Sequence, residues 1–413
     1  MPRRAKHKPA ASSGRAPPVR RRDDQFHHAI PRFILRNFQV GPRKTERQKE
    51  WRRTHVDPDH VLYYDLASGS LDVRSIGSIY GLKNLYKDAS NPSNANELEE
   101  KLSFLEQDAS VVINDLHSNL ASGNATLKRR DVERLRKFMF VMHYRNQGGS
   151  YFDADHPRGG PTIRQWLERY KANHQCRTHT DVWLSVLRYY LDTPHSQILD
   201  DAKAIYDEHG MGRVQLEMLT NIDPNMEHYP ALAYHLQADM SFLCIWEAHE
   251  TSEFILSNDV FGLWEGLAAS GDHIHRVFVV SPRIAVVLRS NMLPMFETLG
   301  PVNSDLLKIP QERPVSKLVN GGAGFRFPEG TDLSSINLNL LRSPDDLFTF
   351  TITKLTLAQT DTFNAVVLKN VHPDGAITFL GKERMLRTIR AFSYDQTNKY
   401  DRQKFISLMR HLS

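Results

Sequence analysis

The 413-residue sequence predicts an α+β fold in which a helical middle region is flanked by β-hairpin and antiparallel or mixed sheet elements. Three observations predict it. Apolar residues recur at helical spacing through much of 97–222, short β-branched and aromatic runs begin at 238, and a hairpin pattern precedes both. Hydrophobic residues form 40% of the chain, which suffices for a core and excludes a wholly disordered protein.

Residues 1–22 are predicted to form a disordered basic tail. They hold eight Lys or Arg and no Asp or Glu, so this tail carries +8 while the whole chain carries +5. Such a charge block suggests a polyanionic partner, most simply nucleic acid. A solubility tail or a nuclear address is the alternative. Order is expected to begin near Phe26.

The segment FHHAIPRFILRNFQ, residues 26–39, has apolar residues at helical spacing and a proline suited to a first turn, which predicts a helix. Arg32 and Arg36 would lie one turn apart and can grip a phosphate or a carboxylate. His27 and His28 are adjacent, so at most one of them is expected to reach a site. The alternative is a docking helix with solvated arginines.

A hairpin is predicted next, with strands at 61–66 and 71–76 and a turn around Gly69, after a polar loop at 41–58. Helical periodicity then predicts a run of helices that form a bundle or a cap. Their expected ranges are 97–120, 128–146, 161–173, 179–192, 196–208 and 212–222.

The last part of the chain changes to a strand pattern. Strands are predicted at 238–248, 253–259, 275–281, 284–290 and 347–354, with 294–346 mostly loop, and closing helices at 360–371 and 382–392. The expected organisation is the tail, one domain over 23–392 with a helical part at 97–237 and a sheet part at 238–392, and a C-terminal extension at 393–413.

The segment EAHETSEFILSNDVFGLWEG, residues 247–266, gathers carboxylates around two predicted strands and a loop. Carboxylates at a strand end can act as a general base or hold a guanidinium group. Arg289, at the end of a later strand, can bind an acidic group. The alternative is a solvated acidic rim.

Several classes of protein find no support in the sequence. Cys176 and Cys244 form no CxxC pattern, so a reducing compartment is expected. No run of about 18 apolar residues predicts a membrane span, and no secretory signal is present. Without metal-ligand spacing or a phosphate-binding loop, neither a metal nor a cofactor is expected. The expected location is cytoplasmic, with a nuclear one as the alternative.

The segments FHHAIPRFILRNF, VLYYDL, FMFVMHYRN, EFILSNDVFGLWEG and SPRIAVVLRS together resemble a family of domains of unknown function from fungi and bacteria. That family opens with H-x-x-P-x-F-x-L-R-x-F, matched here by His28, Pro31, Phe33, Leu35, Arg36 and Phe38. The resemblance spans about 26–392. The fungal branch includes the arginine-containing cyclodipeptide synthases, whose acidic D-D-x-x-E pattern is absent here. The nearest acidic loop has Asp259 and Glu265 at a different spacing.

The resemblance implies an enzyme that joins arginine, delivered on tRNA, to a second aminoacyl group and releases a cyclo-Arg-Xaa diketopiperazine. An aminoacyl ester is already activated, so no ATP site is needed. The implied catalytic residues are Asp259, Glu265 and His28, and the implied substrate-binding residues are Glu247, Glu250, Trp264 and Arg289. The implied tRNA contacts are Arg20, Arg21, Arg22, Arg32 and Arg36. The alternative is a nucleic-acid-binding protein or a metal-dependent nuclease with Asp259 and Glu265 as ligands.

Overall fold

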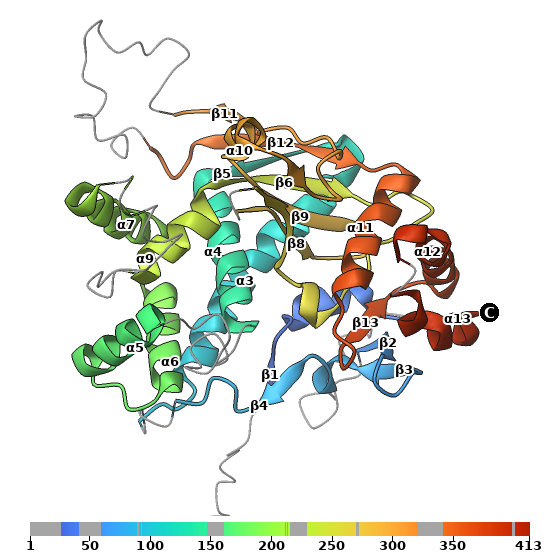
Figure 1. Ribbon diagram of the computed structural model, residues 1–413, viewed down its shortest axis with the longest axis horizontal. Coiled ribbons are helices and arrows are strands. Elements are labelled where there is room, and N and C mark those ends of the chain that lie inside the picture. The colour runs from blue at the N-terminus through green and yellow to red at the C-terminus, as the bar shows by residue number, and fades with distance from the viewer. Residues whose placement is uncertain are drawn as a thin grey trace, which may run out of the picture.

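The computed structural model describes residues 26–40, 59–88, 91, 93–146, 161–210, 212, 214, 229–269, 272–319, 342–398 and 401–413. The predicted α+β class is confirmed. Helices of the middle region lie on one side of a large sheet, and three C-terminal helices lie on the other side (Figure 1).

The large sheet has the strand order β10-β7-β8-β9-β6-β12-β11, and β5 also pairs with β12. Only the β12–β6 pair is parallel among these strands. The strands are β5 (Asn124–Lys128), β6 (Ser241–Glu247), β7 (Leu263–Ala268), β8 (His273–Val279), β9 (Ile284–Ser290), β10 (Val302–Asn303), β11 (Val315–Lys317) and β12 (Leu347–Lys354).

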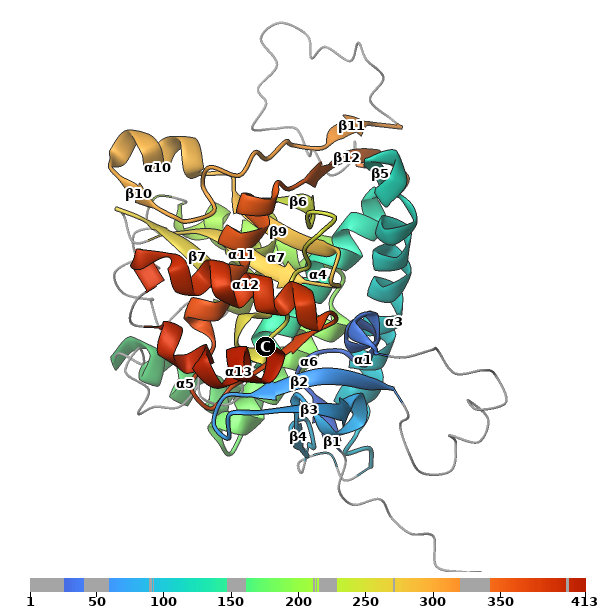
Figure 2. The ribbon, with the colours of Figure 1, turned by 90° about the vertical axis from the view of Figure 1, so that its right-hand side faces the viewer.

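A small sheet of three strands contains the predicted hairpin. Its order is β13 (Ala376–Phe379), β2 (His60–Asp65) and β3 (Ser70–Ser75). It lies beside the C-terminal helices α11 (Leu357–Asn370), α12 (Lys382–Tyr394) and α13 (Ile406–Leu412) (Figure 2). A separate two-stranded ladder joins β1 (Phe26–His28) to β4 (Gly81–Lys83).

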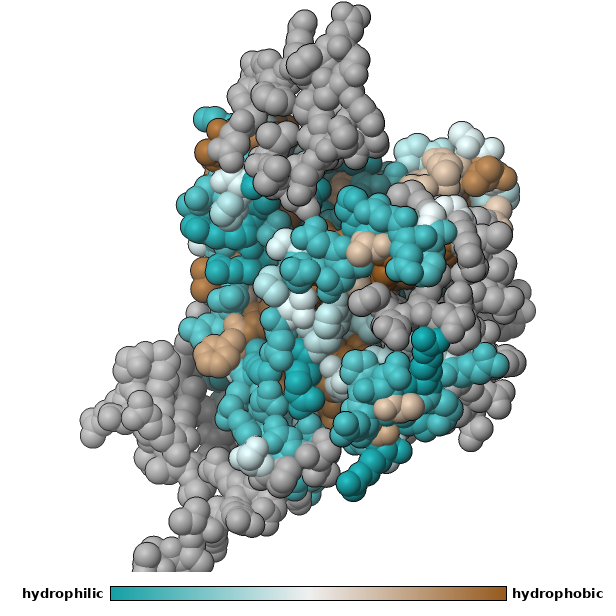
Figure 3. Space-filling model, turned by 90° about the vertical axis from the view of Figure 1, so that its left-hand side faces the viewer, coloured by the Kyte–Doolittle hydropathy of each residue, from teal (hydrophilic) through white to brown (hydrophobic). Residues whose placement is uncertain are grey.

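The long middle helices agree with the helical periodicity of the sequence. They are α3 (Glu97–Ser118), α4 (Arg129–Asn146), α5 (Pro161–His174), α6 (His179–Asp192) and α7 (His195–His209). The short α9 (Tyr229–Tyr234) lies outside the predicted helical ranges. The outer face of this half is mainly hydrophilic, with scattered apolar residues (Figure 3). Within the described ranges, no helix is both long and apolar enough to cross a membrane.

Residues 26–39, which we call the first motif, do not form the single helix that the sequence predicts. Residues Phe26–His28 form strand β1, and only α1 (Arg32–Leu35) and a 3-10 turn (Arg36–Phe38) are helical. Pro31 precedes α1 in an extended conformation, with φ −54° and ψ 138°. Proline lacks an N–H and disfavours helical geometry in the residue before it, so the chain before Pro31 is extended.

Other boundaries also differ from the sequence pattern. The predicted strand at 253–259 is wrong, because this segment has an isolated bridge between Leu256 and Thr378 and a 3-10 turn at Asn258–Val260. The expected loop at 294–346 includes β10, β11 and most of α10 (Leu293–Leu299). The tail 1–22, the loop 41–58 and most of the predicted helix at 212–222 lie outside the described residues.

A buried ion pair joins the start of α4 to the segment before β12. Asp346 is fully buried and accepts hydrogen bonds from Arg129 Nε at 2.9 Å and from the backbone N–H groups of Val319 and Ser343. Burial alone would raise the pKa of Asp346, but these hydrogen bonds outweigh burial and lower it.

Replacing Asp346 with Asn is expected to lower the free energy of unfolding by about 2 kcal/mol at pH 7, because Arg129 then lacks its anion. A lowered folded-state pKa gives stability that is present above the ordinary Asp pKa of about 3.9 and is lost as the pH falls further. Urea unfolding should therefore show a difference between wild type and variant that shrinks below about pH 4. A difference independent of pH would contradict this account.

Candidate functional site

A buried polar cluster lies where the first motif meets α3 and α4. Arg145, in the last turn of α4, has 1% of its surface exposed. Its Nη1 donates to Glu106 Oε1 at 2.7 Å, and its Nη2 donates to the carbonyl of Ala29 at 3.1 Å. One guanidinium group therefore ties α3, α4 and the first motif together. We name this cluster the Arg145 centre, and it consists of His27, Tyr86, Glu99, Glu106, Arg145 and Trp183.

Aromatic rings surround the guanidinium group. The His27 and Tyr86 rings stack, with centroids 5.0 Å apart and an interplanar angle of 15°. The Arg145 guanidinium lies 6.0 Å from the centroid of the Tyr86 ring, and the Trp183 and Tyr86 ring centroids are 5.9 Å apart. Strand alternation directs His27 inward, whereas the neighbouring Phe26 and His28 rings contact each other.

Four polar atoms of the Arg145 centre are buried and have no hydrogen-bond partner in the described part of the chain. They are His27 Nε2, Tyr86 OH, Arg145 Nε and Trp183 Nε1. His27 Nδ1 accepts the backbone N–H of Tyr86 at 2.9 Å, which places the proton of the neutral ring on Nε2. Each of the four atoms can therefore donate.

Buried donors are almost always paired, and an unpaired one costs about 1–3 kcal/mol. Four unpaired donors around one ring are an arrangement that a ligand with acceptor oxygens would satisfy.

Glu99 supplies a titratable carboxyl group beside these donors. It lies on α3 two turns before Glu106 and is partly exposed. Burial raises the pKa of Glu99, Arg145 opposes this shift, and the charge of Glu106 adds to it. A carboxyl group with a raised pKa that is also partly exposed can exchange a proton with a bound substrate.

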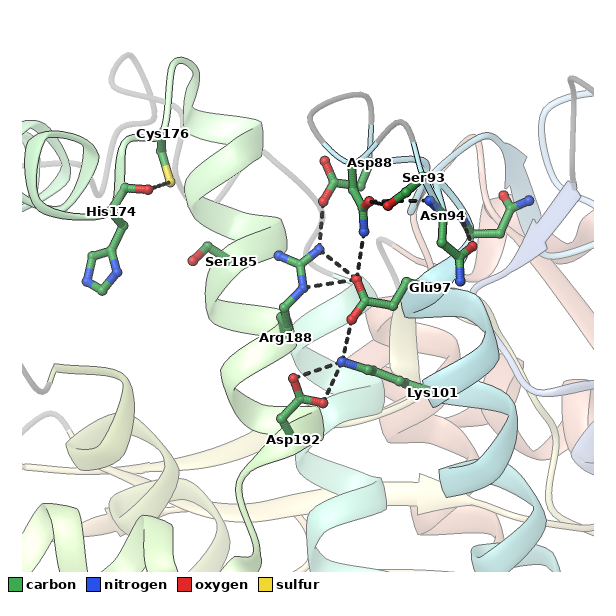
Figure 4. A network of polar contacts seen from close by, with 12 residues as sticks. Asp88, Ser93, Asn94, Glu97, Lys101, His174, Cys176, Ser185, Arg188 and Asp192 are labelled. Atoms are coloured by element: carbon green, nitrogen blue, oxygen red, sulfur yellow. Dashed lines mark hydrogen bonds and ion pairs between the residues drawn. The ribbon is translucent and has the colours of Figure 1, made fainter.

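A network of ion pairs holds the two sides of the Arg145 centre in place (Figure 4). Arg188 of α6 donates to Asp88 at 2.6 Å and to Glu97 at 3.3 Å. Lys101 donates to Asp192, at the end of α6, and also pairs with Glu97. These bonds fasten the first turn of α3, which carries Glu99, and the segment after β4, which carries Tyr86, to α6.

The structure gives His28 a contact different from the catalytic role expected of it. His28 Nε2 lies 2.9 Å from the carbonyl of Ile76, and burial lowers the pKa of His28 to about 4. The neutral ring therefore donates to backbone at pH 7. His27 enters the Arg145 centre instead, and the alternation of a strand is the sequence signal that identifies it. Arg36 pairs with Asp59 at 3.0 Å, and Arg32 is exposed.

The acidic segment 247–266 is spread over several places. Asp259 accepts the backbone N–H of His372 at 3.0 Å, and burial raises its pKa. Glu247 pairs with Arg283 at 2.7 Å, and Glu250 is exposed. Glu253 accepts the N–H groups of the residues just before α12, both at 2.9 Å.

Glu265 is the carboxylate of this segment that lies in a polar row across the sheet. Register places Glu265 opposite His275, and His275 opposite Arg289. Glu265 accepts from His275 Nδ1 and Ser304 Oγ, both at 2.8 Å, and from the N–H of Asp305 at 2.7 Å. Arg289 donates to the carbonyls of Leu307 and Ile309. The structure thus brings Glu265 and Arg289 together.

Trp264 precedes Glu265 on the same strand and faces the opposite side of the sheet. There its ring contacts Arg276 and His143. The expected tRNA contacts Arg20, Arg21 and Arg22 lie outside the described residues. In the described ranges, no group of three or more His, Cys, Asp or Glu side chains is arranged to hold a metal ion.

The comparisons with known proteins give one match. A family model described as a protein of unknown function, DUF4238, matches residues 27–374, which include all six residues of the Arg145 centre. No curated protein and no solved structure matches the chain.

Proposed function

The chain belongs to the DUF4238 family of proteins of unknown function, and from this premise we propose that it is an aminoacyl-tRNA-dependent cyclodipeptide synthase. It joins arginine to a second aminoacyl group and forms a cyclo-Arg-Xaa product. The observation that carries the proposal is the set of unpaired buried donors around Tyr86, with the carboxyl group of Glu99 beside them. The resemblance of the sequence motifs to the arginine-containing synthases supports the choice of substrate.

The chemistry needs a base and a site for an oxyanion. The α-ammonium group of one aminoacyl ester loses a proton, and its nitrogen attacks the carbonyl carbon of the other ester. A C–N bond forms, the ester C–O bond breaks, and the tRNA ribose hydroxyl leaves with a proton. The free amino group of the other residue then attacks the remaining ester carbonyl in the same way, which closes the ring and releases the second tRNA.

In this proposal Glu99 accepts in turn the two protons that the ammonium nitrogen loses, releases the first to solvent and gives the second to the leaving ribose oxygen. The donors of His27, Tyr86 and Arg145 stabilise the tetrahedral oxyanion in a site that excludes water. Glu106 fixes the orientation of the Arg145 guanidinium through the 2.7 Å bond. No step requires ATP, because both carbonyl groups arrive as esters.

Mass spectrometry of a host that expresses the chain tests this proposal. Extracts should contain a cyclo-Arg-Xaa mass that is absent from the empty host. In His27→Phe, which keeps a ring on Tyr86 and removes both the Nε2 donor and the Nδ1 acceptor of the Tyr86 N–H, the amount of product should fall about 10²-fold. Well-expressed protein without such a mass would contradict the synthase and favour nucleic-acid binding without peptide chemistry.

The same extracts test the catalytic roles expected of Asp259 and Glu265, which stay predictions. Asp259→Asn and Glu265→Gln keep the size of each side chain while removing its charge. Loss of product in either variant, with the fold retained, would place that residue in the reaction. Wild-type amounts of product would remove it.

A further inference from the structure

Arg276 of β8 is a buried cation whose charge has no described counterpart. Its side chain is fully buried. Its Nε donates to the carbonyl of Gly262 at 3.4 Å, and both Nη1 and Nη2 have no hydrogen-bond partner in the described part of the chain. Burial is the cause that lowers the pKa of Arg276 to about 9, with no carboxylate opposing it.

Arg145 is buried to a similar degree, but both of its Nη groups have partners. Arg145 has a carboxylate at 2.7 Å and a carbonyl at 3.1 Å. Arg276 has aromatic neighbours, with Trp264 at 4.6 Å and Phe278 at 5.9 Å from its guanidinium carbon. Cation–π contacts contribute about 0.5–2 kcal/mol each, whereas burying an unpaired ion costs several kcal/mol. The aromatic rings alone therefore do not account for the burial of this charge.

The backbone at Gly262 lies close to side chains near Arg276. Gly262 has φ +91°, and a Cβ placed there would lie 3.1 Å from the side chains of both His143 and Phe278. Trp264 stacks on His273 with centroids 5.1 Å apart. The Trp264 and His143 rings are partly exposed, so solvent reaches the edge of this group of residues.

From these contacts we infer that Arg276, framed by Trp264 and His143, is a binding site for an oxyanion, either a carboxylate or a phosphate, of a small-molecule ligand. The two unpaired Nη groups form the fork that binds two oxygens of such an anion at once. The site lies on the face of the β7–β8 pair opposite Glu265 and His275. It does not depend on the proposed synthase activity.

Thermal unfolding of the full chain tests this site. Sodium phosphate or sodium acetate replaces sodium chloride at constant ionic strength, and the unfolding midpoint is followed. An anion that binds the folded state should raise the midpoint and then saturate. Anions that bind the folded and unfolded states equally leave the midpoint unchanged. A response to phosphate alone indicates a phosphate ligand, and a response to acetate indicates a carboxylate.

Arg276→Met supplies the matched variant, and Arg390→Met, at an exposed position on α12, supplies the control. Removing a lone buried charge should leave stability in chloride unchanged or higher. The variant should lose the saturable response and keep the general salting effect of phosphate, whereas the control should behave as wild type. The inference is overturned if neither anion raises the wild-type midpoint, if Arg276→Met responds as wild type does, or if it is strongly destabilised in chloride.

Discussion

Replacement of Glu99 by Gln is expected to lower the rate of cyclo-Arg-Xaa formation by about 10²–10⁴-fold, the range for loss of a general base. Glutamine keeps the size and partial exposure of the side chain but cannot take the ammonium proton. Glu99 has no described ion pair of its own at bonding distance, so the fold should be retained. The measurement is product formation per mole of protein, with the unfolding midpoint as the check on folding.

Glu100→Gln is the matched control, because Glu100 is the next residue on α3 and is exposed. The pH dependence gives a second readout. A base must be ionised, so the wild-type rate should fall as the pH falls through the raised pKa of Glu99. The Gln variant should lack this acidic limb. Equal losses in both variants, or an unchanged acidic limb in Glu99→Gln, would show that Glu99 is not the base.

Arg145→Met is expected to remove product formation and to lower the free energy of unfolding by about 3–5 kcal/mol, the range for breaking a buried ion pair. Methionine fills much of the space but leaves Glu106 without its cation and the carbonyl of Ala29 without its donor. Urea unfolding measures the stability change, and product formation is measured in the absence of urea.

Two further variants separate structure from chemistry at Arg145. Arg145→Lys keeps the charge but loses the two-pronged geometry, so it should recover part of the stability and little of the activity. The double variant Arg145→Met with Glu106→Gln should be more stable than Arg145→Met alone, because the uncompensated carboxylate is gone. Wild-type stability in Arg145→Met would contradict the central place given to this ion pair.

Periodicity in the sequence identifies the long elements well and the short ones poorly. The helical pattern of 179–192 and the apolar run of 284–290 coincide with α6 and β9, because each element buries a continuous apolar face. Strand β13 has four residues, all buried, which is too short for any period to show. Residues 254–256 are apolar because they are buried, but only Leu256 bonds to a strand, through Thr378 of β13. The N–H groups of Phe254 and Ile255 bond to a loop carbonyl and to the Asn364 side chain.

Site residues are harder to predict, because the Arg145 centre is assembled from distant parts of the chain. Tyr86, Glu99 and Trp183 belong to no motif in the sequence. The β1–β4 ladder brings Tyr86 to His27, and helix packing brings Glu99 and Trp183 to the same place. The acidic segment 247–266 misleads because residues that are neighbours in the sequence are separated in the fold. Its carboxylates are close in sequence, but a strand directs alternate side chains to opposite faces, and a turn redirects Asp259.

Synthase activity can be assayed in a reaction of purified protein with arginyl-tRNA that carries isotope-labelled arginine, together with a mixture of other aminoacyl-tRNAs. A synthase should yield a diketopiperazine that contains the label, forms without ATP, and disappears after ribonuclease treatment and in Glu99→Gln. Label that remains on tRNA or is released only as free arginine, with folded wild-type protein present, would contradict this activity.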